Sequence, residues 1–185
     1  MEFRTLRADE ISCRVNQINE KGLTLLLYKD ARVDMDILDE TVGCMNWKKE
    51  YTRDNQNCIV SIWDSEKKEW ISKEDTGTES NSEKEKGLAS DSFKRACVNW
   101  GIGRELYSAP FIWISASDAG IQKDGNGKLK TFEKFTVEAI KYKDKKITHL
   151  SIKNSKGKRV FVIMPKKVEK DELKHFIPLK KIAFI

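Results

Sequence analysis

The sequence predicts an α+β protein in which an antiparallel β-meander packs on a long helix. Three observations support this: alternating strand patterns at the start, two segments with helical periodicity, and three more strand patterns near the end. Their order is two strands, a helix, three strands, a helix and three strands, which lacks the regular strand–helix alternation of a parallel sheet. At 185 residues, the chain is long enough to bury its own core.

The first two strands are predicted at 11–18 and 23–28, with a short turn between them. Asp30 follows directly and is placed to cap the first helix. Gly43 comes after the last apolar position of that helix, so we expect it to end the helix as a left-handed C-cap.

Three strands of a meander are expected next, at 46–53, 57–64 and 69–77. The long helix is then predicted from about Ser82 to Trp100. Its apolar stripe consists of Ala89, Phe93, Ala96, Cys97 and Trp100. At roughly 100° per residue, Lys94 and Arg95 face away from that stripe. Because core packing does not require such a basic pair, it indicates a bound anion.

The second half of the chain predicts a flexible loop over 117–128 and three further strands. The loop contains Asn126–Gly127, a hairpin-turn signal. The strands are expected at 134–142, 146–154 and 158–165. Eight basic residues and one acid lie between Lys141 and Arg159, which favours either a second basic surface or a solvated hairpin face.

The predicted organisation is a core over 1–110, a β-hairpin extension of the same domain over 111–165, and a C-terminal tail over 166–185. The tail has a polar first half and an apolar end. It is either the last piece of this domain or a segment that docks on a neighbouring subunit, and the first interpretation is preferred.

Charge and composition narrow the class of partner. A formal charge of +6 and a pI of about 9.0 favour nucleic acid over a membrane surface, although a soluble protein rich in surface lysines has the same balance. The four cysteines show no metal or redox spacing, which is typical of reduced thiols in the cytosol. No apolar run approaches membrane-spanning length, and no signal peptide is recognised.

Catalytic motifs are missing from the sequence. The two histidines form no nucleophile arrangement, and no Walker phosphate-binding loop is present. We therefore predict no catalytic residue, no metal site and no cofactor. The segment "WDSEKKEW" leaves one enzymatic alternative, since it contains the acid-x-lysine spacing that metal-dependent nucleases use, with Asp64 and Glu66 as the acids to test.

The order of several motifs resembles the Rad-fifty-two/Rad-twenty-two family of single-strand annealing proteins, and most closely its phage-encoded Sak-like recombinases. The motifs are "ISCRV", "ARVDMDILDETVG", a tryptophan just beyond, a three-strand meander and "EKEKGLASDSFKRACVNWGIGREL". Together they cover roughly residues 11–106. The helix with "FKRA" and the aromatic–glycine pair after it is the most specific part.

This resemblance implies subunits arranged side by side in a ring or an open helical assembly, with a basic groove crossing all of them. DNA-binding residues carried over from the family are Arg32 on the first helix and the pair Lys94 and Arg95 on the long helix. Arg104, near the end of the same helix, is a weaker match. Val98 stands where the family often has a further basic residue.

The implied activity is ATP-independent binding of single-stranded DNA and annealing of complementary strands in phage-type recombination and repair. The implied location is the cytoplasm of a bacterial host. Expected partners are single-stranded DNA, further copies of the chain, and a single-strand-binding protein or an exonuclease. Two alternatives stay open: a metal-dependent nuclease, and a regulatory or structural oligomer on the same fold.

Overall fold

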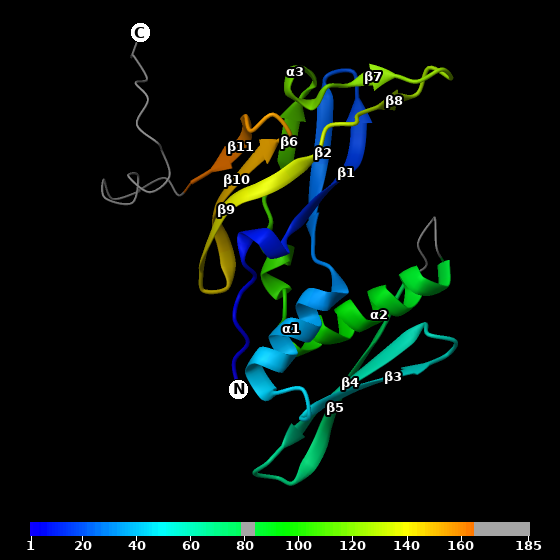
Figure 1. Ribbon diagram of the computed structural model, residues 1–185, viewed down its shortest axis with the longest axis vertical. Coiled ribbons are helices and arrows are strands. Elements are labelled where there is room, and N and C mark those ends of the chain that lie inside the picture. Colours follow the sequence, from blue (N-terminus) through cyan, green and yellow to red (C-terminus); the bar gives the residue numbers. More distant parts are fainter. Residues whose placement is uncertain (79–83, 165–185) are drawn as a thin grey trace, which may run out of the picture.

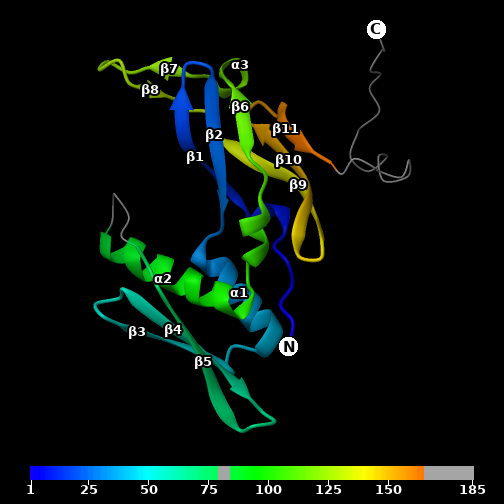
Figure 2. The same cartoon turned by 180° about the vertical axis from the view of Figure 1, so that it is seen from behind.

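The computed structural model describes residues 1–78 and 84–164. Within this part of the chain, the protein consists of a sheet-bearing half and a helix-bearing half (Figure 1). The two halves are connected by the end of β2 and by a 3₁₀ helix, η2 (Arg104–Ser108), which lies between them in both opposite views (Figures 1 and 2). Mixed helices and antiparallel strands confirm the predicted α+β class.

The sheet-bearing half is built on six strands in the order β11-β10-β9-β1-β2-β6. Their bounds are β1 Ser12–Asn19, β2 Gly22–Tyr28, β6 Ile112–Ser115, β9 Phe135–Lys143, β10 Lys146–Asn154 and β11 Arg159–Ile163. All neighbouring strands are antiparallel, and strands from both ends of the chain therefore share one sheet. β1 and β9 pair only where Ser12 lies opposite Thr136, so the sheet opens beyond that point.

The helix-bearing half contains the three-stranded meander β3-β4-β5 and two helices. Their bounds are α1 Ala31–Val42, β3 Trp47–Thr52, β4 Asn57–Asp64, β5 Glu69–Thr76 and α2 Lys84–Trp100. Helix α2 lies across β4 and β5 and contacts α1 along its side. The first predicted positions of the long helix, 82 and 83, lie outside the described residues.

One hydrophobic core runs through the described part of both halves. In the helix-bearing half, Phe93 and Cys97 of α2 are buried together with Val60 of β4. Gly77 makes this packing possible, because a Cβ atom there would lie 2.6 Å from the backbone nitrogen of Ser92. The end of β5 can therefore approach the helix backbone closely.

Several local predictions are wrong. Gly43 ends α1 with φ 81° and ψ 145°, which is not the left-handed helical conformation. The segment predicted as a loop contains a short helix, α3 (Ala116–Ala119), and a two-stranded ribbon of β7 (Gln122–Lys123) and β8 (Leu129–Lys130). Edge strand β6 and the 3₁₀ helix η1 (Ala8–Glu10) had no predicted counterpart. The predicted tail, 166–185, lies outside the described residues.

Candidate nucleic-acid interface

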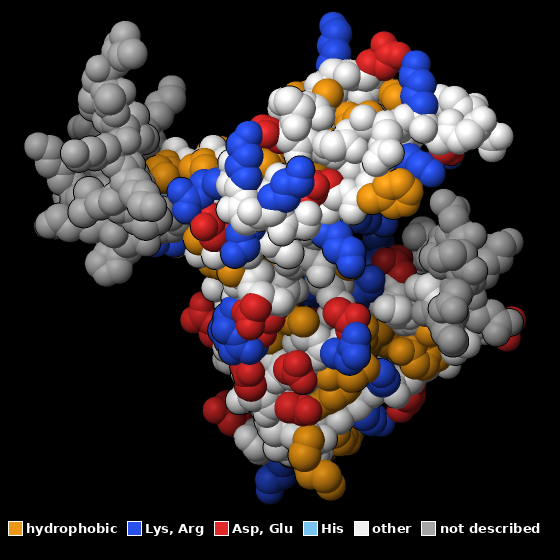
Figure 3. Space-filling view, turned by 45° about the horizontal axis from the view of Figure 1, so that its top comes forward, with side chains coloured by type: hydrophobic (Ala, Val, Ile, Leu, Met, Phe, Trp, Pro, Cys, Tyr) orange, Lys and Arg blue, Asp and Glu red, His pale blue; other side chains and the backbone are white. Residues whose placement is uncertain are grey.

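A hollow of about 370 Å³ lies where the sheet-bearing half meets the helix-bearing half. From the sheet side it is lined by Arg14, Leu26, Leu27, Tyr28 and Lys29. From α2 and the segment after it, the lining residues are Asp91, Lys94, Arg95, Val98, Gly103, Leu106 and Tyr107. We call this hollow the basic groove. Lys and Arg side chains gather in the recess between the two halves in Figure 3.

Helix α2 supplies the basic pair predicted from the sequence. Lys94 and Arg95 both line the groove. Arg95 is held by Asp75 of β5 through a contact of 3.4 Å from Nε to Oδ1. Lys94 makes no hydrogen bond or ion pair with any other described residue. It is half-buried, and its ammonium group interacts through its charge with the carboxylates of Asp30 and Asp34.

Arg32 lies just beyond the groove, at the N-terminal end of α1. Asp30 caps this helix by accepting a hydrogen bond from the Arg32 backbone nitrogen, and it also accepts from the Arg32 side chain, with Nε 2.9 Å from Oδ1. These hydrogen bonds lower the pKa of Asp30 to about 2, and the charge of Lys94 adds to the effect. The Arg32 side chain is 83% exposed, so its guanidinium remains open to solvent.

A buried ion pair forms the floor of the groove. Lys29, at the end of β2, donates to both carboxylate oxygens of Asp34 on α1, and neither side chain reaches solvent appreciably. Burial raises the pKa of Asp34 to about 6, against the opposing effect of Lys29, and raises the pKa of the neighbouring Cys97 thiol well above its usual range. The pair therefore links β2, α1 and α2 at the point where the halves join.

Gly103 is required by this floor. It has a φ of +69°, and a Cβ atom there would lie 2.2 Å from Cε of Lys29. The Lys29 stem therefore packs directly on the Gly103 backbone. The glycine after the long helix does more than release the chain, because it leaves room for the buried lysine.

The sheet side of the groove carries apolar side chains and one exposed cation, Arg14. In the β1–β2 register Arg14 lies opposite Leu26, and Ser12 lies opposite Tyr28, so these side chains share one face of the sheet. Leu26 and Tyr28 are both about two-fifths exposed. A ligand in the groove would thus meet cations from α2 and apolar surface from β2.

Arg104, like Arg32, does not line the groove. Its guanidinium donates to the backbone oxygen of Val98, with Nη2 at 2.8 Å, and to that of Asn99 at 3.1 Å. It therefore satisfies carbonyl groups at the C-terminal end of α2, where a cation also complements the helix dipole. Its exposed side lines a neighbouring hollow.

Sequence reasoning missed Arg14, Lys29 and Tyr107 as groove residues. Arg14 lay in a predicted strand whose register was unknown. Lys29 lay between a predicted strand and a predicted helix, and its partner Asp34 is five positions away, which is not a helical spacing. Of the three, only Tyr107 gave a local signal of a binding residue, because it is an aromatic residue close to the glycines that end the long helix.

Most tryptophans of the helix-bearing half are engaged within the protein. Trp47 stacks on Phe93 at 6.2 Å between ring centroids, and Trp63 packs edge-on against Trp70 at 5.5 Å. Trp100 donates from Nε1 to the Val60 carbonyl at 3.0 Å. These rings are structural, so the aromatic groups available to a groove ligand are tyrosines.

The residues that suggested a nuclease form a turn. The Asp64 carboxylate accepts hydrogen bonds from the backbone nitrogens of Glu66 and Lys67, at 3.0 and 3.1 Å. Among the described residues, no group of three or more His, Cys, Asp or Glu side chains is arranged to hold a metal ion. None of the described helices combines the length and hydrophobicity that a membrane crossing requires.

No protein-family model, curated protein or solved structure matches this chain significantly.

Proposed function

We propose that this protein binds single-stranded DNA in the basic groove and anneals complementary strands without ATP. The observation that carries the proposal is the convergence of Lys94, Arg95 and Arg14 on one hollow, with Arg32 exposed beside it. The cations sit on helices and a paired strand, so their spacing is fixed before a ligand arrives. The phosphates of a nucleic-acid backbone are the anions that such a row of cations suits.

The chemistry of annealing fits this arrangement. Annealing breaks no covalent bond, so it needs no nucleophile. A protein that neutralises the phosphates of one strand lowers the repulsion felt by a second strand. Phosphate contacts carry no sequence information, which suits a protein that must accept any strand and leave the base edges free for pairing.

Self-assembly belongs to the same proposal. Few phosphate contacts per subunit give weak binding, and each contact with a single strand contributes about 0.7 to the slope of log affinity against log salt. Copies arranged side by side in a ring or helical assembly would bind one strand many times and raise its affinity through multivalency. We place this activity in phage-type recombination and repair, in the cytoplasm of a bacterial host, with a single-strand-binding protein or an exonuclease as partner.

The test removes the basic pair of α2. Lys94→Ala with Arg95→Ala should abolish binding and annealing of single-stranded oligonucleotides, while the oligomer and the fold are retained because alanine favours helix. The matched control is Lys67→Ala with Lys68→Asn, which removes two adjacent cations from the β4–β5 turn, and it should bind as the wild type does. If the α2 double variant still binds DNA with wild-type affinity, the groove is not the binding site.

A further inference from the structure

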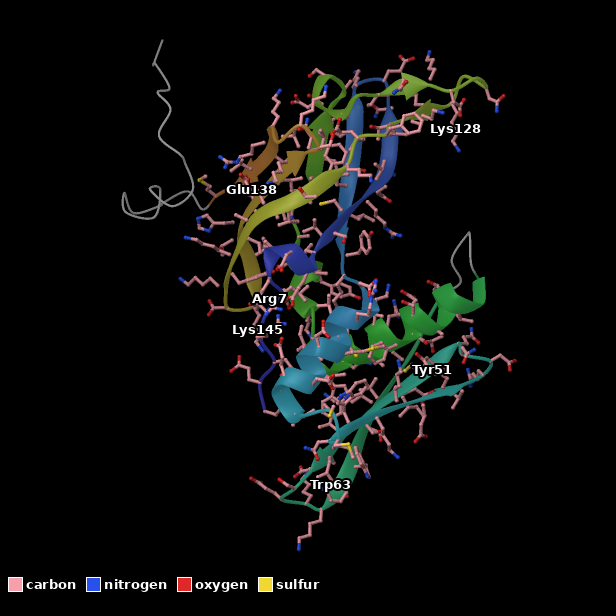
Figure 4. All side chains as sticks on the ribbon, in the orientation of Figure 1. Arg7, Tyr51, Trp63, Lys128, Glu138 and Lys145 are labelled. Carbon is pink, nitrogen blue, oxygen red and sulfur yellow. The ribbon has the colours of Figure 1, made fainter. Side chains whose placement is uncertain are left out.

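A second cationic hollow of about 460 Å³ lies next to the basic groove. It is formed by the end of α2, by η2 and by the turn of the β9–β10 hairpin. Its lining includes the cations Arg104, Lys145 and Lys146 and one acid, Asp144. Figure 4 shows Lys145 at this turn, away from the strands of the sheet. The net charge of the lining is positive, since three cations face one carboxylate.

The two hollows share Tyr107. This side chain lines both of them and is 74% exposed, although it lies on the segment that connects the two halves of the molecule. An exposed ring flanked by cations on both sides is the arrangement on which a base of a single strand stacks while its phosphates are neutralised. Neither hollow needs to open or close for one ligand to contact both.

The second hollow is held rigidly. Ser108 Oγ accepts a hydrogen bond from the Ile147 backbone nitrogen at 2.8 Å, which fixes the hairpin to η2. Glu105 in η2 accepts from the Leu6 backbone nitrogen at 2.7 Å, which fixes η2 to the N-terminal segment. Arg104 is fixed by the carbonyl groups at the end of α2. The charges therefore keep a constant position relative to Tyr107.

The cations of the second hollow remain accessible to a ligand, although acidic side chains lie near them. Lys145 pairs with Glu2 at 3.2 Å, but both side chains are exposed, at 48% and 79%, and such a surface pair is easily replaced by a phosphate. Lys146 is also exposed. The hollow can thus accept an anion without first breaking a buried contact.

We infer that the bound strand does not end in the basic groove but continues over Tyr107 into the hollow of Arg104, Lys145 and Lys146. This inference rests on the proposed function and extends it. Each subunit then contacts more nucleotides than α2 alone can reach, and Tyr107 separates two groups of phosphate contacts. Arg104 takes part from the second hollow rather than from the groove.

The first experiment measures the affinity of oligothymidylates of increasing length at several salt concentrations. Lys145→Asn with Lys146→Ala should bind the shortest strands as the wild type does and long strands roughly tenfold more weakly. The slope of log affinity against log salt should fall by about 1.4 for two lost phosphate contacts. Asparagine is chosen because Lys145 has a φ of +57°, a conformation that asparagine tolerates.

The control for this experiment is Lys67→Ala with Lys68→Asn, since Lys68 also has a φ of +57° in a hairpin turn. It removes the same charge from an equivalent backbone and should bind strands of every length normally. If the Lys145 and Lys146 double variant matches the control in affinity and salt slope, the inference is wrong, while the groove proposal stands or falls with the α2 double variant. A wild-type protein that binds no strand overturns both.

Tyr107 provides an independent arm. Tyr107→Ala should weaken binding of long strands by about tenfold, within the range for loss of one stacked base, whereas Tyr107→Phe should retain nearly full affinity because the ring is kept. Equal losses for the two variants would refute the stacking role.

Discussion

The two walls of the basic groove differ in how their side chains are held. On the α2 wall, Arg95 is paired with a carboxylate from the meander, and the half-buried Lys94 interacts through its charge with Asp30 and Asp34. On the sheet wall, Leu26 and Tyr28 present apolar surface beside one exposed cation, Arg14. One wall is therefore suited to phosphates, and the other is suited to the less polar parts of a strand.

This difference shows that the shape of the groove depends on the contact that holds its two walls together, which we call the joint, as much as on the charges of the walls. The α2 wall and the sheet wall belong to different halves of the molecule, and the buried pair of Lys29 and Asp34 connects them. A change at the joint should disturb both walls, whereas a change on one wall should alter binding and leave the fold intact.

The largest effect is expected from Asp34→Ala. This variant leaves the Lys29 ammonium buried without its carboxylate, which should lower the free energy of unfolding by about 3–5 kcal/mol. Denaturant unfolding followed by circular dichroism measures the loss. Asp36→Ala, on the exposed side of α1, is the control and should change stability by no more than about 0.5 kcal/mol.

Replacing both partners distinguishes a lost ion pair from a damaged helix. Lys29→Met with Asp34→Leu removes both charges and fills the space with apolar groups, so most of the stability should return. A double variant as unstable as Asp34→Ala would mean that the two walls are not joined by this pair.

The second largest loss of stability is expected at Gly103, whose backbone packs on the Lys29 side chain. Gly103→Ala must displace the Lys29 stem and also adopt a φ of +69°, so we expect a loss of about 1–3 kcal/mol in the free energy of unfolding. Gly120→Ala is the matched control, because Gly120 has a φ of +56° and no atom within 4 Å of an added Cβ. Only the excess cost at Gly103 reports on Lys29, and equal costs would contradict its packing there.

The α2 wall could be anticipated from the sequence and the sheet wall could not. Lys94 and Arg95 are adjacent on a helix with a regular apolar stripe, so their direction follows from helical geometry alone. The strands of the meander also followed from alternation and turns. Local sequence patterns were therefore enough to predict the long helix, the meander strands and the basic pair.

The sheet wall depends on contacts between distant parts of the chain. Its residues come from β1 and β2, whose register shifts at the bulge between Val15 and Gln17 of β1, and the groove forms only where they meet α2, far along the chain. Neither the register nor the order of strands can be obtained from alternation, which gives only the two faces of one strand. For the same reason, the closeness of Arg104 to Lys145 was not foreseen.

A smaller effect is expected from changing the charge of the α2 wall. Asp75→Asn removes the carboxylate that partly neutralises Arg95, so single-stranded DNA should bind about two- to fivefold more tightly at low salt, as for one exposed ion pair. The gain should disappear as salt rises. Glu69→Gln, an exposed change at the opposite end of β5, alters net charge equally and should have little effect. Equal gains from both variants would indicate a general charge effect instead of a local one.

The smallest effect concerns Asp30, which holds Arg32 at the edge of the α2 wall. Asp30→Asn keeps the helix cap but loses the negative charge at the N-terminus of α1, so the variant should be less stable by about 0.3–1 kcal/mol at neutral pH. Hydrogen bonds from Arg32 lower the pKa of Asp30 to about 2 in the folded protein. The carboxylate therefore adds stability above the unfolded-state pKa of roughly 3.9, and this contribution is lost as pH falls through about 2.

Unfolding of both proteins over the range from roughly pH 6 to pH 2 provides the measurement. The stability difference should be constant in the upper part of the range and become small at its lower end, where Asp30 is about half protonated in the wild type. A difference that persists when the carboxylate is neutral would mean that asparagine caps α1 poorly. In that case Arg32 is positioned by the cap alone, and the carboxylate contributes nothing to holding this cation beside the groove.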